Sequence, residues 1–275
     1  MARRDPHNSA RFWNDRSVPG LSLMCADFTT QEFAPHVHDG YVIAATETGG
    51  ARIKSRGVIG QAHHSRLFVF NPGEPHSGWM GSSNRWTYRA FYVPQPAIAA
   101  INTALGRQHP VYFSSNDFAD ATLIERFLLL HRELEQGHDA FRARELLAEA
   151  FETLFARYAS TAMRAAPPPK DRALFDTARE IMQSRYGEHL LLDELAGEVG
   201  LSPFQLIGLF KRRAAMTPHA YLTQVRLARA CERLKQGEPI AHAALACGFY
   251  DQAAFTHAFK RTYGITPLQF ARAFA

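Results

Sequence analysis

The chain has 275 residues, enough for one or two domains, and its 46% hydrophobic and 21% charged residues are typical of a globular protein with apolar cores. The net charge of +5 permits a nucleic-acid or other anionic partner but does not require one. Three cysteines without paired spacing exclude a disulfide scaffold, the N-terminus has no signal-peptide pattern, and no apolar run approaches the roughly 20 residues that cross a bilayer, so we expect a cytoplasmic protein with no membrane partner.

Short runs rich in β-branched and aromatic residues lie between about residues 20 and 95, separated by Gly, Pro and Asn. Clear examples are residues 41–46, 51–54, 67–70 and 86–93. This texture predicts a small antiparallel β-barrel or sandwich. Aromatic side chains are frequent in these runs, and aromatic-lined concavities are common ligand sites.

Two histidine-containing segments lie among the predicted strands, at residues 36–38 (His-Val-His) and 72–76 (Pro-Gly-Glu-Pro-His). They resemble the two sequence motifs of cupins, barrel proteins that bind small molecules and often a metal ion. The resemblance places His36, His38 and His76 at metal-ligand positions, where imidazoles can hold Zn²⁺ or Fe²⁺. Glu47 lies farther along the chain than the motif's carboxylate. We therefore expect no metal cofactor and interpret the histidines as the lining of a metal-free pocket, with a divalent metal site as the alternative.

Two amphipathic segments follow the strands, at residues 117–135 and 139–158. The short turn between them predicts an antiparallel helical hairpin over about residues 117–160. Residues 164–170 include three consecutive prolines, which end a helix and form a stiff spacer. We expect an N-terminal domain over residues 1–163, a linker over 164–170 and a second domain over 171–275.

One short pattern occurs twice in the second domain. Phe-Lys-Arg at residues 210–212 recurs at 259–261, and Thr-Pro at 217–218 recurs at 266–267. Each copy begins with a small-residue helix and a Gly-containing turn, and its second helix ends in a basic cluster. This arrangement is typical of a helix-turn-helix. Between the copies, residues 218 to about 236 predict one long helix that would fix the spacing of the two units.

The outer face of the second helix of each unit is available to the DNA major groove. The predicted base-facing residues are Phe204, Gln205, Ile207 and Gly208 in the first unit and Gln252, Ala253, Thr256 and His257 in the second. The predicted phosphate contacts are Lys211, Arg212, Lys260 and Arg261. Charge agrees with this assignment, because residues 199–275 hold ten Lys/Arg and three Asp/Glu, a balance of +7, whereas residues 171–198 hold three Arg and seven acids, a balance of −4.

The joint spacing of these motifs over about residues 172–275 resembles the AraC/XylS family of bacterial transcription regulators. The resemblance rests on residues 195–196, 200–203, 206, 210–211, 217–218, 248–249, 255, 259–260, 264 and 266–270. It implies an all-α domain with two helix-turn-helix units on one linking helix, and it places the family's base-reading positions at the eight residues above. Ile207 and Gly208 depart from the family pattern, which commonly has a long polar residue and an Arg there. The first recognition helix is therefore poor in base-directed hydrogen bonds.

The strands of the first domain resemble the family's sensor barrel over about residues 20–95. This implies an α+β protein, with a cupin-like antiparallel barrel and helical hairpin followed by the all-α domain. It also implies a small-molecule effector in the barrel and a homodimer formed through the hairpin. The expected pocket contacts are His38, Tyr41, His76, Trp79, Trp86 and Tyr88.

The leading hypothesis is an effector-responsive activator that binds double-stranded promoter DNA and acts with RNA polymerase. No catalytic residue is expected, since the sequence has no Gly-rich phosphate loop and no Gly-x-Ser-x-Gly motif. One alternative is a metal-dependent cupin enzyme that uses His36, His38 and His76. Another is a constitutive DNA-binding protein whose barrel is only a scaffold. Metal analysis separates the first alternative, and the effect of metabolites on DNA affinity separates the second.

Overall fold

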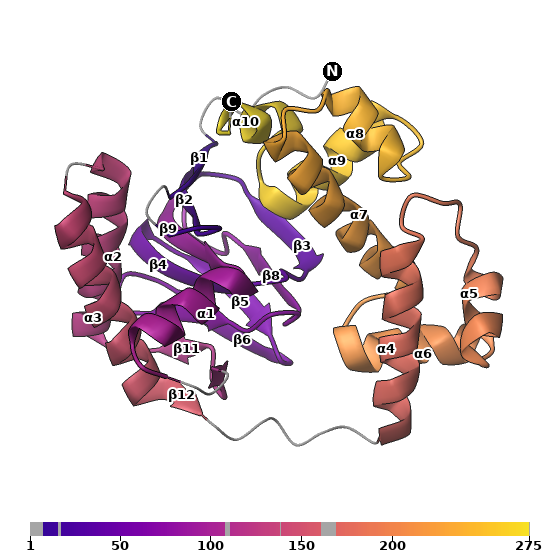
Figure 1. Cartoon of the computed structure of the whole chain (residues 1–275), viewed down its shortest axis with the longest axis horizontal. Helices are drawn as coiled ribbons and strands as arrows, with labels where there is room; N and C mark the ends of the chain where they lie inside the picture. The colour runs from indigo at the N-terminus through magenta and orange to yellow at the C-terminus, as the bar shows by residue number, and fades with distance from the viewer. Residues whose placement is uncertain (1–7, 16–17, 108–110, 138, 161–168, 275) are drawn as a thin grey trace. The chain divides into compact units, whose positions relative to one another are not determined.

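A computed structural model describes residues 8–15, 18–107, 111–137, 139–160 and 169–274. The chain forms two compact units (Figure 1): the first consists of Met1–Glu32 and His38–Arg164, and the second of Phe33–Val37 and Ala165–Ala275. Most strands lie in the first unit, and the described part of the second unit is helical except for its short segment Phe33–Val37, so the predicted α+β fold is confirmed. Most of the predicted linker lies outside the described residues, and its last two residues already belong to helix α4 (Pro169–Ser184).

Among the described residues, most strands belong to two antiparallel sheets. The larger has the order β1-β2-β9-β4-β7-β11, and its strands are Ser9–Asn14, Ser22–Phe28, Trp86–Val93, Tyr41–Gly49, Leu67–Phe70 and Asp117–Phe118. The smaller has the order β3-β8-β5-β6, and its strands are Glu32–His36, His76–Trp79, Ala51–Ser55 and Val58–Ala62. Strands β1 and β11 were not predicted from the sequence, since β1 precedes the predicted barrel and β11 is only two residues long.

Alternation along the central strands gives the larger sheet two different faces. One face packs against the helices of the unit in a continuous apolar core, which includes Leu23, Ile43 and Phe91. The opposite face carries the neighbouring residues of the same strands, among them Thr46, Tyr88 and Tyr92. We call this second face the inner face.

The helices in the described part of this unit are α1 (Gln95–Ala104), α2 (Ala121–Gln136) and α3 (Ala140–Tyr158). Helices α2 and α3 lie side by side along the sheet (Figure 1) and form the predicted hairpin. Asp120 and Asp139 cap their N-termini, and Gly137 ends α2 with a φ of 65°, which glycine adopts without strain. The first helix of the hairpin begins at Ala121 and not at Asp117, because Asp117 and Phe118 form β11 and Asp120 is the N-cap. Two short strands, β10 (Tyr112–Phe113) and β12 (Ala159–Ser160), pair beside α3.

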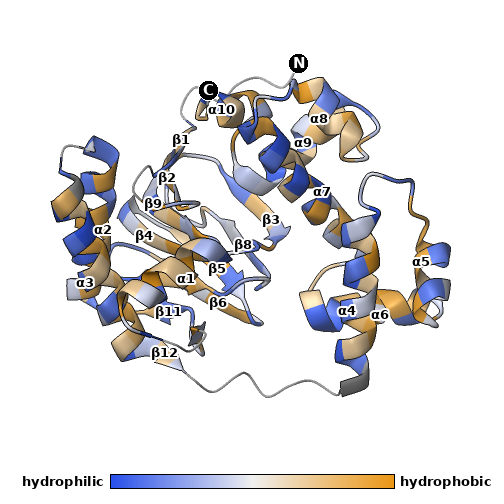
Figure 2. Cartoon of the chain, viewed as in Figure 1, coloured by the Kyte–Doolittle hydropathy of each residue, from blue (hydrophilic) through white to orange (hydrophobic). Residues whose placement is uncertain are grey.

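Within residues 169–274, the second unit contains helix α4 and six further helices. They are α5 (Leu192–Val199), α6 (Pro203–Ala214), α7 (Pro218–Lys235), α8 (Ile240–Ala246), α9 (Gln252–Tyr263) and α10 (Pro267–Arg272). Polar and apolar residues alternate around them (Figure 2), as expected for helices that bury one stripe. Around Phe210, the first helix-turn-helix packs on α4. No helix among the described residues has the length and apolar character needed to cross a membrane.

Candidate functional sites

The recognition helix of the first helix-turn-helix, α6, begins at a capping box. The Ser202 hydroxyl accepts a hydrogen bond from the Gln205 amide, and the Gln205 side-chain oxygen accepts one from the Ser202 amide at 2.9 Å. Pro203 occupies the first turn, where its missing N–H costs nothing. The buried stripe of α6 contains Leu206 and Phe210.

The residues predicted to face bases in α6 are accessible to different degrees. Phe204 is 87% exposed and Gln205 is exposed, whereas Ile207 and Gly208 are half-buried. The amide oxygen of Gln205 is already engaged by the cap, so only its NH₂ group is available for a base. The outer face of α6 therefore offers an apolar ring and little hydrogen bonding.

The recognition helix of the second helix-turn-helix, α9, is capped by Asp251, whose carboxylate accepts a hydrogen bond from the Ala254 backbone amide at 2.7 Å. Its predicted base-facing side chains are more polar than those of α6. Gln252 and His257 are exposed together with Ala253, and Thr256 is half-buried.

Tyr250, directly before the cap of α9, is 92% exposed. The sequence prediction did not include Tyr250. A large aromatic residue beside a helix cap was the signal that could have identified it.

The basic ends of the recognition helices differ in their ion pairs. Within the ranges that the structure describes, Lys211, Lys260 and Arg261 form no ion pair with a carboxylate, and all three are exposed. Arg212 is different, because its Nη2 lies 3.0 Å from a carboxylate oxygen of Asp171 in α4. Arg212 therefore has an acidic partner within its own unit.

Four of the predicted pocket side chains lie at the inner face of the larger sheet. Trp86 and Tyr88 belong to strand β9 of this sheet, and His38 and His76 lie beside it, with His38 against Tyr92. Trp86 and Tyr88 stack with ring centroids 4.2 Å apart, and the indole N–H of Trp86 donates to the Thr46 hydroxyl at 3.1 Å. His38 lies 5.2 Å from His76, ring centroid to ring centroid. Trp86, Tyr88 and Thr46 are buried and uncharged, so this part of the inner face is aromatic and carries hydroxyl groups.

Two predicted pocket residues lie on other faces. Tyr41 belongs to the core against the helices, and its hydroxyl donates to the Val111 carbonyl. Trp79 is paired with the exposed residue Arg52 in the smaller sheet, on the face opposite His76. The reason is strand alternation: Tyr41 is out of phase with Val42, and Trp79 is out of phase with His76. We therefore do not retain these two residues as pocket contacts.

The three histidines of the cupin-like motifs come together. One ring nitrogen from each of His36, His38 and His76 lies within 4.8 Å of the others. The Nδ1 of His36 lies 2.8 Å from the Ala34 carbonyl, and the Nδ1 of His76 lies 3.0 Å from the Glu74 carbonyl. A carbonyl only accepts, so both rings carry a proton on Nδ1. Burial lowers the pKa of His36 to about 4, which keeps the ring neutral at pH 7.

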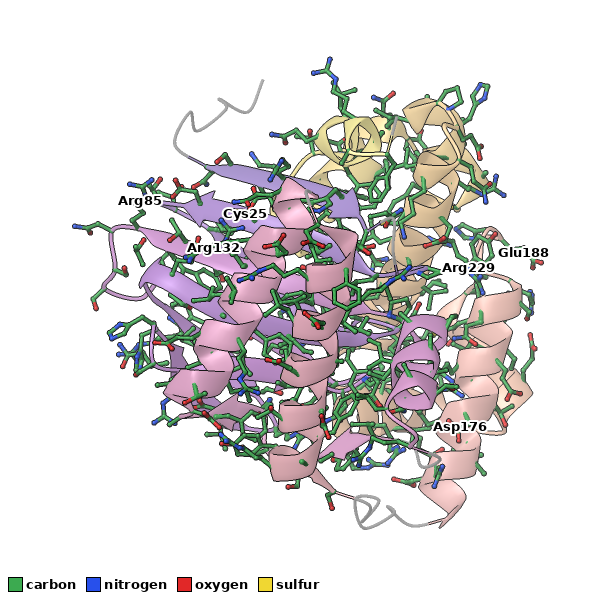
Figure 3. All side chains as sticks on the ribbon, turned by 60° about the vertical axis from the view of Figure 1, so that its left-hand side comes forward. Cys25, Arg85, Arg132, Asp176, Glu188 and Arg229 are labelled. Atoms are coloured by element: carbon green, nitrogen blue, oxygen red, sulfur yellow. The ribbon has the colours of Figure 1, made fainter. Side chains whose placement is uncertain are left out.

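Glu47, the distant carboxylate considered for a metal site, takes part in a different network. It accepts from Arg132 at 2.7 Å and pairs with Arg89 at 3.0 Å, between the sheet and α2 (Arg132 is labelled in Figure 3). Burial raises the pKa of Glu47, but the hydrogen bonds and charges of the two arginines outweigh it and hold the pKa below its usual value. Glu47 therefore serves as an ion-pair partner for these two arginines.

Comparison with known sequence families assigns both units. A profile of the AraC-like ligand binding domain matches residues 18–151, and a profile of a helix-turn-helix domain matches residues 195–273. Together they cover most of the chain.

Relatives over most of the chain are transcriptional regulators. YbfI, an HTH-type transcriptional regulator of Bacillus subtilis, is 29% identical over 225 residues, 81% of each chain. The arabinose operon regulatory protein of Salmonella typhimurium is 25% identical over 98% of this chain and 97% of the relative. A solved structure of ToxT from Vibrio cholerae, bound to an unsaturated fatty acid, has the same fold, with a TM-score of 0.58 at 12% identity over 98% of this chain and 97% of that one.

Proposed function

Because the chain belongs to the AraC family of DNA-binding transcriptional regulators, we propose that it activates transcription from promoter DNA in response to a small effector. The main support is the pair of capped recognition helices, α6 and α9, each with an exposed outer face and a basic C-terminal turn. Helix α7 joins the two helix-turn-helix motifs within one compact unit, so both recognition helices can enter major grooves at a fixed spacing.

The two units would contribute differently to specificity. Gln252 and His257 of α9 can donate and accept hydrogen bonds at base edges. The exposed Phe204 of α6 offers an apolar contact, which suits the methyl group of thymine. We expect the second helix-turn-helix to read hydrogen-bonding patterns and the first helix-turn-helix to prefer a site with thymine.

Selection of bound sites from a random duplex pool tests this function. We expect a motif with two blocks about one helical turn apart, and less information in the block bound by α6. The His257→Ala variant should relax the preference of the other block by about 1–3 kcal/mol per affected base pair. Recovery of no motif, with or without a pool of metabolites, would contradict a sequence-specific regulator.

The effector would be a small uncharged molecule with an aromatic or apolar body. On their inner side, the central strands present residues such as Met24, Thr46, Tyr88 and Tyr92, none of which carries a formal charge at pH 7. Burial raises the pKa of both tyrosines, so their hydroxyls stay protonated and can donate a hydrogen bond. A charged ligand would find no opposite charge among these inner side chains, because the charged Glu47 and Arg89 of the same strands pair toward α2.

A Trp86→Leu variant tests the effector surface. The matched control is Trp79→Leu, because Trp79 lies in the smaller sheet on the face opposite His76. The effector's influence on DNA affinity should fall at least tenfold in Trp86→Leu, because the large ring contact is lost, about 1.4 kcal/mol or more. Trp79→Leu should keep the response. Fluorescence anisotropy of labelled promoter DNA, titrated with and without the effector, measures both. Equal losses in the two variants would contradict this placement.

The homodimer and the contact with RNA polymerase are also proposals. Leu129 of α2 and Phe141 of α3 are exposed, at 41% and 73%. Apolar residues of this size on a helical hairpin support a second copy of the chain as the partner. Sedimentation at micromolar concentration tests the dimer, and a monomer at all concentrations would contradict it.

Metal binding by the three histidines is a second candidate role of the sensor unit. The observation that favours it is the orientation of His36 and His76, because a proton on Nδ1 leaves the lone pair of Nε2 for a cation, as in histidines that ligate metals. Metal analysis of the purified protein tests it. A stoichiometric divalent ion that is lost in the double variant His36→Gln, His38→Gln would support this role, and a metal content below a tenth of the protein would reject it.

A further inference from the structure

Arg212 of the first recognition helix is held by a carboxylate from another helix. Its Nη2 and Nε both donate to the same oxygen of Asp171, at 3.0 and 3.2 Å. The Arg212 side chain is 60% exposed and the Asp171 side chain 31% exposed, so the pair lies at the surface of the unit. Asp171 is the third residue of α4, whereas Arg212 lies in the last turn of α6.

The missing side chain of Gly208 leaves room for the guanidinium of Arg212. Side chains of an α-helix lean toward its N-terminus, so a residue covers the surface near the position four residues earlier. A Cβ atom added at Gly208 would lie 3.2 Å from Nη1 of Arg212, closer than an ordinary contact. The guanidinium of Arg212 therefore occupies the surface next to Gly208, on the face predicted to meet DNA.

Asp171 also brings a negative charge to this face. The basic residues Lys211, Lys260 and Arg261 form no ion pair among the described residues, whereas Arg212 does. A DNA phosphate carries the same charge as Asp171 and binds the same guanidinium nitrogens. Phosphate and carboxylate therefore compete for Arg212, and the carboxylate repels the phosphate.

We propose that Asp171 is a competitor of DNA for Arg212: it holds Arg212 across Gly208 in the free protein, and Arg212 leaves it for a backbone phosphate in the complex. Asp171 thereby sets the DNA affinity of the first helix-turn-helix without touching DNA. This inference rests on the proposed binding of promoter DNA. It explains why an exposed arginine on the recognition face has an acidic partner while the neighbouring Lys211 has none among the described residues.

The test uses the full chain and a duplex that carries its selected site. Equilibrium affinity is measured by fluorescence anisotropy for the wild type, Asp171→Asn, Arg212→Gln and the double variant, between about 50 and 200 mM salt. Asp176→Asn is the matched control. Asp176 lies on the same helix (Figure 3) and pairs with Arg172 and Arg179 of α4, not with a recognition helix. It loses the same charge, and its side chain is 38% exposed.

Asp171→Asn should strengthen DNA binding by about two- to fivefold, the range of an exposed ion pair. Asp176→Asn should have a smaller effect. In the Arg212→Gln background, Asp171→Asn should do no more than Asp176→Asn. Arg212→Gln should also reduce the slope of log affinity against log salt by about 0.9, as for one lost phosphate contact.

Equal effects of Asp171→Asn and Asp176→Asn would overturn the proposal, since only net charge would then matter. A full effect of Asp171→Asn without Arg212 would overturn it as well. A loss in Arg212→Gln that is confined to one base pair would replace phosphate contact by base reading and would also reject it. Failure of the wild type to prefer any site would reject the proposed function instead, and that outcome is separate because it appears before any variant is compared.

Discussion

At the scale of single residues, the buried carboxylate of Glu74 organises the turn that leads into His76. It accepts hydrogen bonds from the Ser55 hydroxyl at 2.9 Å, from two nitrogens of Arg56 at 2.7 Å and from the Asn71 amide group at 2.8 Å. Burial raises the pKa of Glu74, but these bonds and the charge of Arg56 outweigh it, so the pKa lies below its usual value. Arg56 adopts a φ of 53°, which a residue other than glycine rarely does without such support.

Replacing Glu74 by Gln should lower the free energy of unfolding by about 3 kcal/mol, because the buried side chain at position 74 loses its charge and the half-buried guanidinium of Arg56 loses its charged partner. Urea unfolding at pH 7 measures this, with Glu125→Gln, an exposed position on α2, as the control. The folded-state pKa of Glu74 is depressed, so its contribution is present above its unfolded pKa and disappears as the pH falls through the folded value. A loss below about 1 kcal/mol would show that the network contributes little.

At the scale of elements, His131 attaches helix α2 to the larger sheet. Arg89 donates to Nδ1 of His131 at 3.0 Å, and Nε2 of His131 donates to the Met24 carbonyl at 3.1 Å. Because an arginine only donates, Nδ1 must be unprotonated and the ring neutral. Burial, and then the charge of Arg89, lower the pKa of His131 to about 3. The hairpin is therefore docked in a way that opposes protonation.

The stability of the first unit should depend on this histidine in mild acid. The folded pKa lies below the unfolded value near 6.5, so the contribution of neutral His131 is complete above about pH 6.5 and is lost as the pH falls toward 3. The free energy of unfolding should then decrease by up to about 1.4 kcal/mol per pH unit for this group. Urea unfolding at several pH values, for the wild type and His131→Gln, measures the slope. An unchanged slope in the variant would contradict the role of His131.

At the scale of the whole molecule, one junction in the second unit ties the two helix-turn-helix units together. Arg226 of α7 donates to the carbonyls of Tyr186 and Glu188, both at 2.8 Å. Gly248, in the turn of the second helix-turn-helix, lies against the same group: a Cβ atom there would meet the Tyr186 carbonyl at 2.7 Å and Arg226 at 3.0 Å. The segment after α4, helix α7 and the second turn therefore meet at one place.

The two turn glycines separate backbone conformation from close packing. Gly200 has a φ of 72° and nothing within 4 Å of an added Cβ, whereas Gly248 has a φ of 78° and is crowded. Gly200→Ala should cost about 1–2 kcal/mol of unfolding free energy, from the left-handed backbone alone. Gly248→Ala should cost clearly more and should also weaken binding to a two-block DNA site. Urea unfolding and DNA anisotropy measure the pair, and equal costs would show that the junction yields without strain.

The helices of the second unit could be predicted because their signals are local. Ser202 before Pro203, Gly200 and Gly248 at turns, and repeated Phe-Lys-Arg and Thr-Pro pairs each act within a few residues, so the sequence predicts where the helices begin and end. The inner and outer faces of the strands were harder. A one-residue change of phase moves a side chain to the other face, which is why Tyr41 and Trp79 were assigned to the pocket and lie elsewhere.

The sequence by itself therefore determined the family, the α+β organisation and the two recognition helices, since these depend on residue type and short spacing. The tertiary structure alone decided which distant groups meet. Asp171 lies against Arg212, Glu47 pairs with Arg89 and Arg132, and His131 reaches the Met24 carbonyl across more than a hundred residues of chain. Such pairs depend on how elements pack and on strand register, and neither is written in the spacing of residues along the chain.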